Sequence, residues 1–407
     1  MNYVVKEKTQ SKIVGEITND KDEIAVAKKD AYANLSKKVK IPGFRLGKAP
    51  YEIGSAYIGD ERLLEEAFEL LLDKSLNEFL EKEQIDPFTK PKVDVKEFGN
   101  ERIVYEVLVE FLPHIDFDPD MKIELKKTIE VKEEEIEEKL KELQDTFTEL
   151  EPKESAVENG DIIEVAYKIG DKEEQTITIE IGKDKVYGNF NEVVLGKNIG
   201  DEFEVGSQNT AIRFRLLSIK TKKVPEINDD FAKKALGVDS LDALKEKIQK
   251  EIYENKRLQM VEDRGRIALS TLAKDLQVEL PENYIGEEVE SRFKEYETEY
   301  LKHGVKLESL LEKEGKRVED FKNEIRGEVI QELKESLILK EIIAKKGLTV
   351  SDEEIQQEFE HMLEEEHLQG KGVKMNDKVR RYIKNEILKS KALSILKENA
   401  IILFGGE

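Results

Sequence analysis

Residues 41–50, which read IPGFRLGKAP, combine side chains that suit the binding of a polyanion. Arg45 offers a planar guanidinium and Lys48 a point charge, and both groups bind phosphates. The ring of Phe44 can stack on a nucleobase or enter an apolar crevice. The two glycines of the stretch permit turn conformations at little steric cost. Such a loop is typical of a surface that binds RNA and protein together. The alternative is an ordinary turn between two helices, with Phe44 packed inward.

The distribution of charge favours the first interpretation. The whole chain carries a formal net charge of −23, whereas its first fifty residues hold eleven Lys and Arg against six Asp and Glu, a net charge of +5. The remaining residues therefore carry −28. A basic N-terminal segment on an otherwise acidic chain indicates that this segment binds a polyanion, while the acidic remainder keeps the protein soluble. Ordinary surface lysines would give the same composition.

Other reactive chemistry is scarce in this sequence. The absence of cysteine excludes disulfides, thiol nucleophiles and zinc–thiolate sites. His361 and His367 share a Glu-rich stretch, but a spacing of six residues does not place them on one helical face. We expect neither a cofactor nor a metal. The sequence shows no apolar run with the length of a signal peptide or a membrane span, so we expect a cytoplasmic protein with no membrane partner.

The loop needs rigid elements on both sides, and the apolar pattern predicts them. Apolar residues recur at helical spacing before the loop, Pro42 and Gly43 end that helix, and Pro50 can open the next one. Asp20 or Asp22 is the expected N-cap of the first helix. The predicted elements of this α+β domain, which ends near Pro113, are a strand at 1–17, helices at 22–39, from 50 and at 60–84, and a strand at 101–113.

The rest of the chain changes character twice. Residues 131–149 predict a charged helix with a thin apolar stripe, residues 150–222 a small β-rich domain, and residues 225–402 an almost wholly helical segment. With 39% charged and 38% hydrophobic residues, the composition is polar for one compact globule of 407 residues. We therefore expect an elongated α+β multidomain protein with several small cores. The helical segment should break near Gly237, Pro281, Gly304, Gly315 and Gly347.

The loop also forms a recognisable motif. GFRLGKAP resembles the ribosome-binding signature of the trigger factor family, the bacterial chaperones of nascent chains. All six defining positions of that signature match, and they are Gly43, Phe44, Arg45, Gly47, Lys48 and Pro50. Four further segments resemble segments of the family and follow one another in the family's order: residues 224–237, 276–290, 348–359 and 383–400. The resemblance covers nearly the whole chain.

This resemblance implies a domain organisation and a function. The implied domains are a ribosome-binding domain at 1–113, a connector helix segment at 114–149, a truncated FKBP-like isomerase domain at 150–222 and a helical chaperone domain with arms at 223–407. The implied function is that of an ATP-independent chaperone. It would dock on protein and rRNA of the large ribosomal subunit at the exit tunnel, bind nascent and unfolded polypeptides, and assist folding, export and cell division. A weak homodimer away from the ribosome is left open.

The resemblance also implies a prolyl isomerase pocket, of which this sequence retains only part. The residues at the positions of the pocket are Tyr167, Val186, Tyr187, Phe190 and Phe214. The family's domain carries an insertion after its first strand and a flap before its last strand. Here the stretch from Gly170 to Gln175 and the stretch EVGSQNTAIRF are too short for either. Packing in the core of a small β domain would explain the same aromatic residues.

The enzymatic status is therefore open. A residual or weak isomerase is the leading interpretation, and an active isomerase whose chaperone body mainly recruits substrate is the alternative. A similar helical body also occurs in periplasmic chaperones linked to parvulin-type isomerases, but the ribosome-type loop and the missing signal peptide argue against that class. Isolated apolar residues of the helical segment suit either weak client binding or helix packing, and they include Leu301, Leu310, Leu311, Met362 and Phe404.

Overall fold

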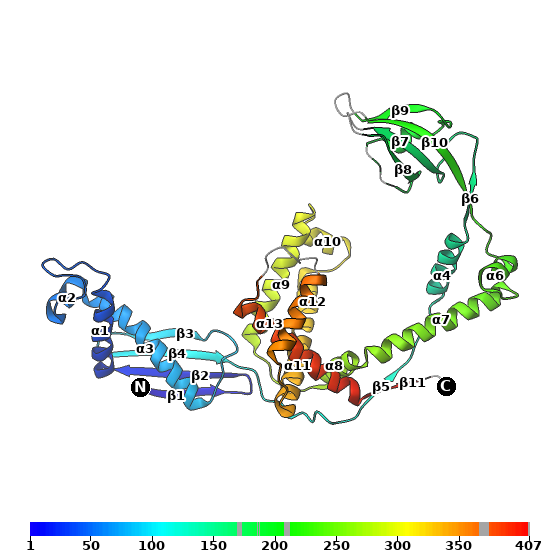
Figure 1. Ribbon diagram of the computed structural model, residues 1–407. Helices are drawn as coiled ribbons and strands as arrows, with labels where there is room; N and C mark the ends of the chain where they lie inside the picture. The colour runs from blue at the N-terminus through cyan, green and yellow to red at the C-terminus, as the bar shows by residue number, and fades with distance from the viewer. Residues whose placement is uncertain (169–172, 185, 187, 207–211, 366–373, 406–407) are drawn as a thin grey trace. The chain divides into compact units, whose positions relative to one another are not determined.

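The computed structural model describes residues 1–168, 173–184, 186, 188–206, 212–365 and 374–405 (Figure 1). The chain divides into two compact units. The first comprises Met1–Leu125 and Asp263–Leu403, and the second comprises Lys126–Glu262 and Phe404–Glu407. Both units combine antiparallel sheets with helices, which confirms the predicted α+β multidomain class. Within the described ranges, no helix combines the length and apolar character needed to cross a bilayer.

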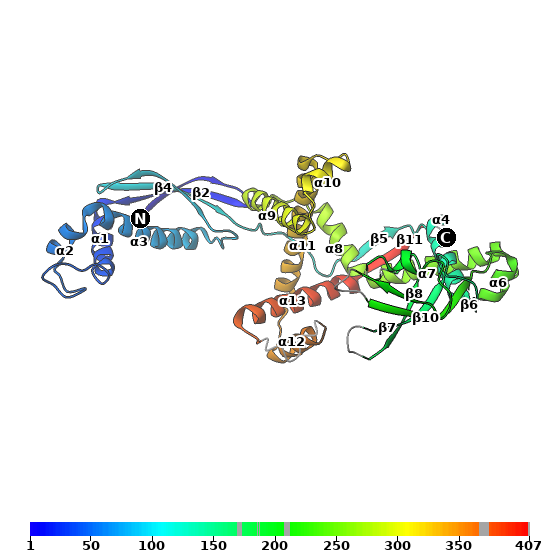
Figure 2. The same cartoon turned by 90° about the horizontal axis from the view of Figure 1, so that it is seen from above.

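The N-terminal part of the first unit is a four-stranded antiparallel sheet with two helices on one face (Figure 2). Strand alternation directs Ile13 and Ile17, together with Ile103 and Tyr105, toward the helices, where all four are buried. In sheet order the strands are β1 (Asn2–Lys8), β2 (Lys12–Asp20), β4 (Arg102–Glu110) and β3 (Lys92–Phe98), and the covering helices are α1 (Lys21–Leu35) and α3 (Asp60–Glu83).

Two strands of this sheet differ from the sequence expectation. The single strand predicted at 1–17 is a hairpin, because the chain turns at residues 9–11 and the two arms pair with each other. Strand β3 was not predicted at all. It lies at the edge of the sheet and most of its residues are exposed, so it lacks the apolar alternation of a half-buried strand.

The rest of the first unit is a helical body. Its elements are α8 (Arg264–Asp275), α9 (Glu282–Lys302), α10 (Leu307–Lys313), α11 (Val318–Lys346), α12 (Asp352–Glu365) and α13 (Asp377–Asn399), and a small sheet pairs β5 (Ile123–Lys127) with β11 (Ala400–Phe404). The expected breaks are confirmed. Pro281 precedes α9, and Gly304, Gly315 and Gly347 adopt positive φ angles at or near helix ends.

The sheet and the helical body of this unit share a specific polar contact. Pro281, the residue before α9, gives the helix no side-chain cap. Glu110, the last residue of β4, supplies one, since its carboxylate accepts from the N–H groups of Asn283 at 2.8 Å and Tyr284 at 3.1 Å. Glu110 is buried, and the rings of Phe88 and Tyr284 pack edge to face beside it. A carboxylate at this position satisfies open amides and opposes the helix dipole.

The second unit holds a helical cluster and a five-stranded sheet. Apolar residues of α4 (Glu133–Thr146) pack on α6 (Asp229–Leu236) and α7 (Leu241–Glu262). The predicted stripe on α4 is confirmed in part, because Ile136 and Leu140 are buried. The strands are β6 (Glu149–Pro152), β10 (Ile212–Lys223), β7 (Ile162–Lys168) and β8 (Gln175–Glu180), with β9 (Glu202–Val205) also paired to β10, and α5 (Phe190–Val194) packs nearby.

Candidate functional site

The sequence motif lies in the loop between α1 and α2 (Tyr51–Ile58), at one end of the N-terminal part (Figure 1). Helix α1 begins with a capping box: the Asp20 carboxylate accepts from the N–H of Asp22 and of Glu23, and Glu23 accepts from the N–H of Asp20. This confirms Asp20 as the cap. The helix ends at Leu35, earlier than predicted, because the next residues form a tight turn with bonds back to its last carbonyls.

Buried residues anchor both ends of the loop. Ile41 and Ala49 are 5% and 9% exposed and pack with Tyr32 of α1. The Tyr32 hydroxyl lies 2.6 Å from the carbonyl oxygen of Ala49 and 3.1 Å from that of Pro50. Gly54 of α2 faces this hydroxyl, and a Cβ there would lie only 2.0 Å from the Tyr32 oxygen. Only glycine therefore lets α2 approach α1 at the base of the loop.

The two motif glycines shape the exposed part of the loop. Gly43 and Gly47 have φ angles of +83° and +73°, which other residues adopt at a cost. The N–H of Gly47 donates to the carbonyl of Ser36 at 2.8 Å, so the loop folds back on the end of α1. Two further turns are closed by the N–H of Phe44 to Ile41 and by the N–H of Lys48 to Arg45. The motif side chains thus project from a backbone with defined turns.

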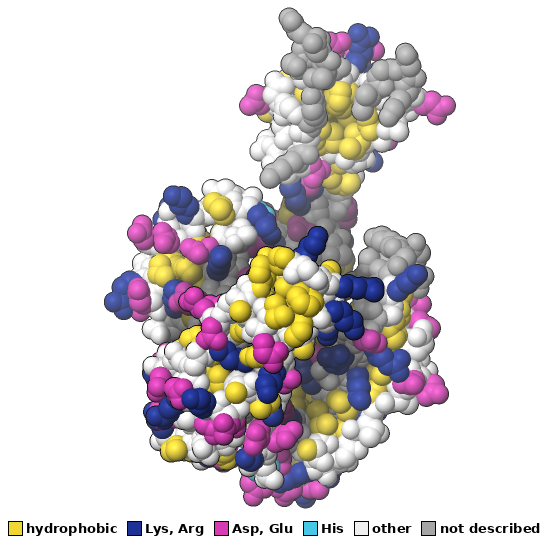
Figure 3. All heavy atoms as spheres, turned by 90° about the vertical axis from the view of Figure 1, so that its left-hand side faces the viewer, with side chains coloured by type: hydrophobic (Ala, Val, Ile, Leu, Met, Phe, Trp, Pro, Cys, Tyr) yellow, Lys and Arg dark blue, Asp and Glu magenta, His cyan; other side chains and the backbone are white. Residues whose placement is uncertain are grey.

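The loop presents an apolar patch together with cations. Phe44 is 37% exposed rather than packed between the helices, and Leu46 is 53% exposed. On α2, Ile53 and Tyr57 are 50% and 55% exposed. We call Phe44, Leu46, Ile53 and Tyr57 the tip patch. Figure 3, viewed from the side on which α2 lies in Figure 1, shows apolar side chains gathered there with Lys and Arg side chains beside them.

The cations of the loop are available to a ligand. Arg45 and Lys48 are exposed, and neither has a carboxylate partner in the part of the chain that the structure describes. Most other basic side chains of this part of the unit are paired, for example Lys28 with Asp60 and Lys82 with Glu78. Unpaired cations around exposed apolar side chains can bind phosphate groups and an apolar crevice at the same time.

The sequence analysis missed three residues of the tip patch. Ile53 and Tyr57 are four residues apart and therefore share one face of α2, next to the side on which Gly54 meets Tyr32. Leu46 lies inside the motif at its variable position. The spacing of Ile53 and Tyr57 signals an apolar helical face, but the sequence does not show whether another element covers that face.

Four of the five expected isomerase residues lie together in or against the core of the second unit's sheet domain. Phe190 and Phe214 are 1% and 3% exposed, with ring centroids 4.9 Å apart. Tyr167 and Val186 are half-buried against the same core, and the Tyr167 hydroxyl donates to Gln175 at 2.8 Å. Tyr187 lies outside the described residues. The rings fill an apolar core, to which Phe203 also belongs although the sequence analysis did not name it.

The apolar residues singled out in the helical segment behave differently from one another. Leu301 near the end of α9 is 62% exposed, whereas Leu311 of α10 is 4% exposed and packs in a core with α9 and α11. Tyr296, on the same helix as Leu301, is 41% exposed. Helix α9 thus carries exposed apolar side chains, while α10 buries Leu307 and Leu311 in the core.

Comparison with known proteins agrees with the architecture. A family model described as "Bacterial trigger factor protein (TF)" matches residues 1–143, and one described as "Bacterial trigger factor protein (TF) C-terminus" matches residues 240–398. The chain is 28% identical over 400 residues to trigger factor of Alkaliphilus oremlandii, covering 92% of this chain and 93% of the relative. It is 27% identical over 429 residues to trigger factor of Clostridium kluyveri, covering 99% and 100%.

A solved structure agrees at the level of the fold. The structure described as "Promiscuous Substrate Recognition in Folding and Assembly Activities of the Trigger Factor Chaperone" aligns with a TM-score of 0.56 at 23% identity. The alignment covers 98% of this chain and 99% of that chain. The two family models match the N-terminal and C-terminal parts in order, and the curated relatives span almost the full length. The chain therefore belongs to the bacterial trigger factor family.

Proposed function

We propose that this protein is a ribosome-associated, ATP-independent chaperone. Its tip loop docks on protein and rRNA of the large ribosomal subunit beside the exit tunnel, and its helical body binds nascent and unfolded polypeptides. In this role the protein works in the cytoplasm and assists folding and export. The observation that carries the proposal is the exposed group of Phe44, Arg45 and Lys48 on a loop whose ends are buried. A loop built this way presents its side chains without first having to order them.

The shape of the tip explains why both RNA and protein are proposed as partners. Phosphates attract Arg45 and Lys48, and binding that neutralises phosphates releases counterions and weakens as salt rises. The tip patch instead needs an apolar surface, which a ribosomal protein supplies more readily than a phosphate backbone does. We therefore expect salt to weaken binding without abolishing it, because only the phosphate contacts are sensitive to salt.

The test is co-sedimentation of the full chain with purified large ribosomal subunits. Phe44→Ala/Arg45→Ala/Lys48→Ala should lower binding at least tenfold and leave the fold intact, because all three side chains are exposed. The matched control is Leu258→Ala/Lys141→Ala/Lys250→Ala in the second unit. It removes one exposed apolar side chain and two exposed lysines that have no carboxylate partner among the described residues. The proposal fails if the triple variant sediments with the subunits as the control does.

The second unit's sheet domain is proposed to be a weak or residual isomerase. Two of its four described candidate residues are almost fully buried, and only residues 169–174 and 206–211 join the strands where the family's pocket loops would lie. A twisted amide needs a water-excluded pocket before oriented dipoles stabilise it strongly. The alternative, an active isomerase whose helical body recruits substrate, predicts robust turnover of a short prolyl peptide.

A further inference from the structure

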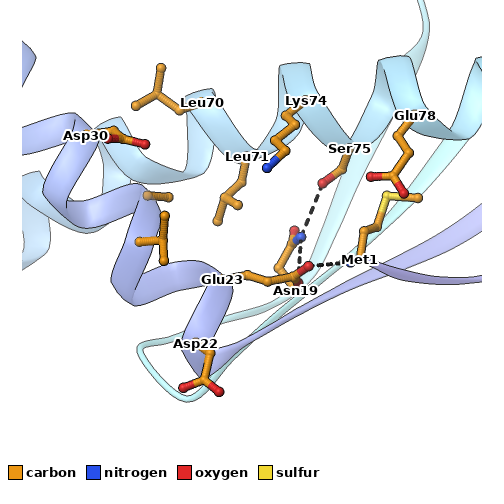
Figure 4. A pocket seen from close by; sticks show the side chains of 12 residues that line it. Met1, Asn19, Asp22, Glu23, Asp30, Leu70, Leu71, Lys74, Ser75 and Glu78 are labelled. Atoms are coloured by element: carbon orange, nitrogen blue, oxygen red, sulfur yellow. Dashed lines mark hydrogen bonds and ion pairs between the residues drawn. The ribbon is translucent and has the colours of Figure 1, made fainter.

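A groove between α1 and α3 lies outside the tip loop (Figure 4). It has a cavity of about 370 Å³. Val26, Leu70 and Leu71 give it an apolar lining, Asp22, Asp30 and Glu78 give it acidic side chains, and Lys74 gives it a basic one. We call this the α1–α3 groove. Its charge is opposite to that of the tip loop, although both belong to the same N-terminal part.

Two carboxylates of the groove are unpaired. Glu23 binds the α-amino group of Met1, and Glu78 binds Lys82 at 2.7 Å. Asp22 and Asp30 are exposed, and neither has a cationic partner among the residues that the structure covers. The lining holds four carboxylates, on Asp22, Glu23, Asp30 and Glu78, against two cations, Lys74 and the α-amino group of Met1. The groove therefore keeps a net negative charge beside aliphatic side chains, which disfavours the phosphates of RNA.

A buried acceptor lies in the same groove. Asn19 is 1% exposed, and its side-chain nitrogen donates to Glu23 at 3.3 Å and to Ser75 at 3.2 Å. Its Oδ1 atom has no hydrogen-bond partner in the described structure. Figure 4 shows Asn19 projecting between α1 and α3 toward Ser75. A buried amide oxygen without a donor is unfavourable, so a ligand that brings an N–H group into the groove gains from it.

These features select one chemistry. A Lys or Arg side chain has an aliphatic stem for the leucines and Val26, N–H donors for the open acceptor, and positive charge for Asp22 and Asp30. The groove already holds one ammonium group, that of Met1 on Glu23. An acidic or phosphate-bearing ligand could pair only with Lys74 and would be repelled by Asp22 and Asp30.

We propose that the α1–α3 groove binds a basic segment of a large-subunit ribosomal protein, as a second contact beside the tip loop. This inference rests on the proposed function. Under the proposed function the loop docks on ribosomal RNA and protein, and the cationic loop suits the RNA whereas the net negative groove suits a basic protein segment. Val26 lies nine residues before the end of α1, roughly 13 Å along the helix, so both contacts are within reach of one docking surface.

The first test compares two double variants of the full chain with purified, empty large subunits. Asp22→Asn/Asp30→Asn should weaken binding about three- to tenfold. The control, Glu65→Gln/Glu69→Gln, removes the same charge from an exposed part of α3 outside the groove and should bind like wild type. Thermal unfolding followed by circular dichroism shows whether both variants keep the fold.

The outcomes separate this inference from the proposed function. If the groove variant binds like its control while the tip-loop triple variant does not bind, the groove plays no part and the proposed function stands. If the tip-loop triple variant still binds, the proposed function itself fails. Equal weakening by both double variants would show a general charge effect and would also overturn the groove assignment.

The second test identifies the occupant. Val26 is 61% exposed, so p-benzoylphenylalanine can replace it without filling a core. On empty large subunits we expect a crosslink to a basic ribosomal protein, identified by mass spectrometry, and none from the same label at Leu258. A crosslink that forms only with a nascent chain on translating ribosomes, only with rRNA, or only with a second copy of this chain overturns the assignment.

Discussion

At the scale of single residues, Gly54 and Tyr32 decide how the tip loop is held. The Tyr32 hydroxyl contacts the carbonyl oxygens of two successive loop residues, and Gly54 leaves the space that the ring occupies. Neither residue belongs to the six-position motif. The motif therefore supplies the side chains that meet a ligand, and this buried pair supplies their position.

Gly54→Ala should destabilise the N-terminal part and weaken ribosome binding, although residue 54 is not exposed to the ligand. The new Cβ would lie 2.0 Å from the Tyr32 oxygen, so α2 must move away from α1. Overpacking of this kind costs about 1–3 kcal/mol. Urea unfolding and subunit co-sedimentation measure the two effects. Ala56→Gly, on the same helix, is the control for helix propensity, and equal loss of binding in both variants would contradict the steric explanation.

A partly buried ion pair predicts that the second unit's sheet domain is sensitive to alkaline pH. Lys153 is hydrogen-bonded to Asp161 at 2.7 Å and to Glu158 at 2.6 Å, and these hydrogen bonds raise the pKa of Lys153 above its usual range. A raised lysine pKa stabilises the fold fully below the unfolded-state value. The contribution is lost as pH rises through the folded-state pKa, above roughly pH 10.5.

Lys153→Met should therefore lower the free energy of unfolding by about 1–3 kcal/mol at pH 7, because Asp161 stays buried without its cation. The difference from wild type should shrink as pH is raised above about 10.5. Urea unfolding at several pH values measures it. Lys183→Met, which removes an exposed lysine, should change little at any pH. A wild-type advantage that persists unchanged in strong alkali would show that Lys153 stabilises by packing alone.

At the scale of elements, the sheet domain of the second unit is attached by two adjacent strands. Lys223 of β10 is paired directly with Glu149 of β6, and the register continues to Lys220 and Pro152. The chain therefore enters and leaves the domain at neighbouring positions. Helices α4, α6 and α7 on the other side of this attachment have a core of their own.

Excision of residues 150–222, with a short Gly-Ser linker in their place, should give a soluble protein that still suppresses aggregation of an unfolded client. The ends to be joined are paired in the intact chain, so a short linker spans them. Light scattering of a chemically denatured client on dilution measures the activity. A folded, monodisperse product without any activity would place client binding in the excised domain.

The elements also show what the sequence could and could not predict. Helices α1 and α3 and strand β4 were predicted because their apolar residues repeat with one clear period. Strand β11 was missed because AIILF directly follows α13 and pairs with β5, more than 270 residues away in the chain. The loop motif was recognised by its resemblance to the family signature, because its residue types alone also allowed an ordinary turn between two helices. Ile53, Tyr57 and the α1–α3 groove depend on what packs beside them, which the sequence does not state.

At the scale of the whole molecule, the proposal is for a chaperone that retains the framework of an isomerase domain. The candidate residues Phe190 and Phe214 belong to the hydrophobic core, and a residue in the core serves stability first. Chaperone activity and prolyl isomerisation are therefore expected to be separable in the full-length protein.

The intact protein should suppress client aggregation but show weak or undetectable turnover of an Xaa-Pro-Phe peptide in a protease-coupled assay. Uncatalysed isomerisation over a barrier of about 18–20 kcal/mol supplies the baseline rate. Tyr187→Ala is the control for any residual activity. Robust turnover that this substitution abolishes would show that the short strand connections still form a working pocket, and the alternative function would then hold.

The carboxylate of Glu110 connects the end of strand β4 directly to the first turn of helix α9. Under the proposed function, a client bound to the exposed apolar residues of α9 would pull on that helix, and the load would pass through two N–H···O bonds to the Glu110 side chain and into β4. Strand β4 is bonded along its length to β2 on one side and β3 on the other, so it resists displacement better than a loop would. The pull of a moving polypeptide would therefore reach the sheet on which α1, the helix that leads into the proposed docking loop, is packed.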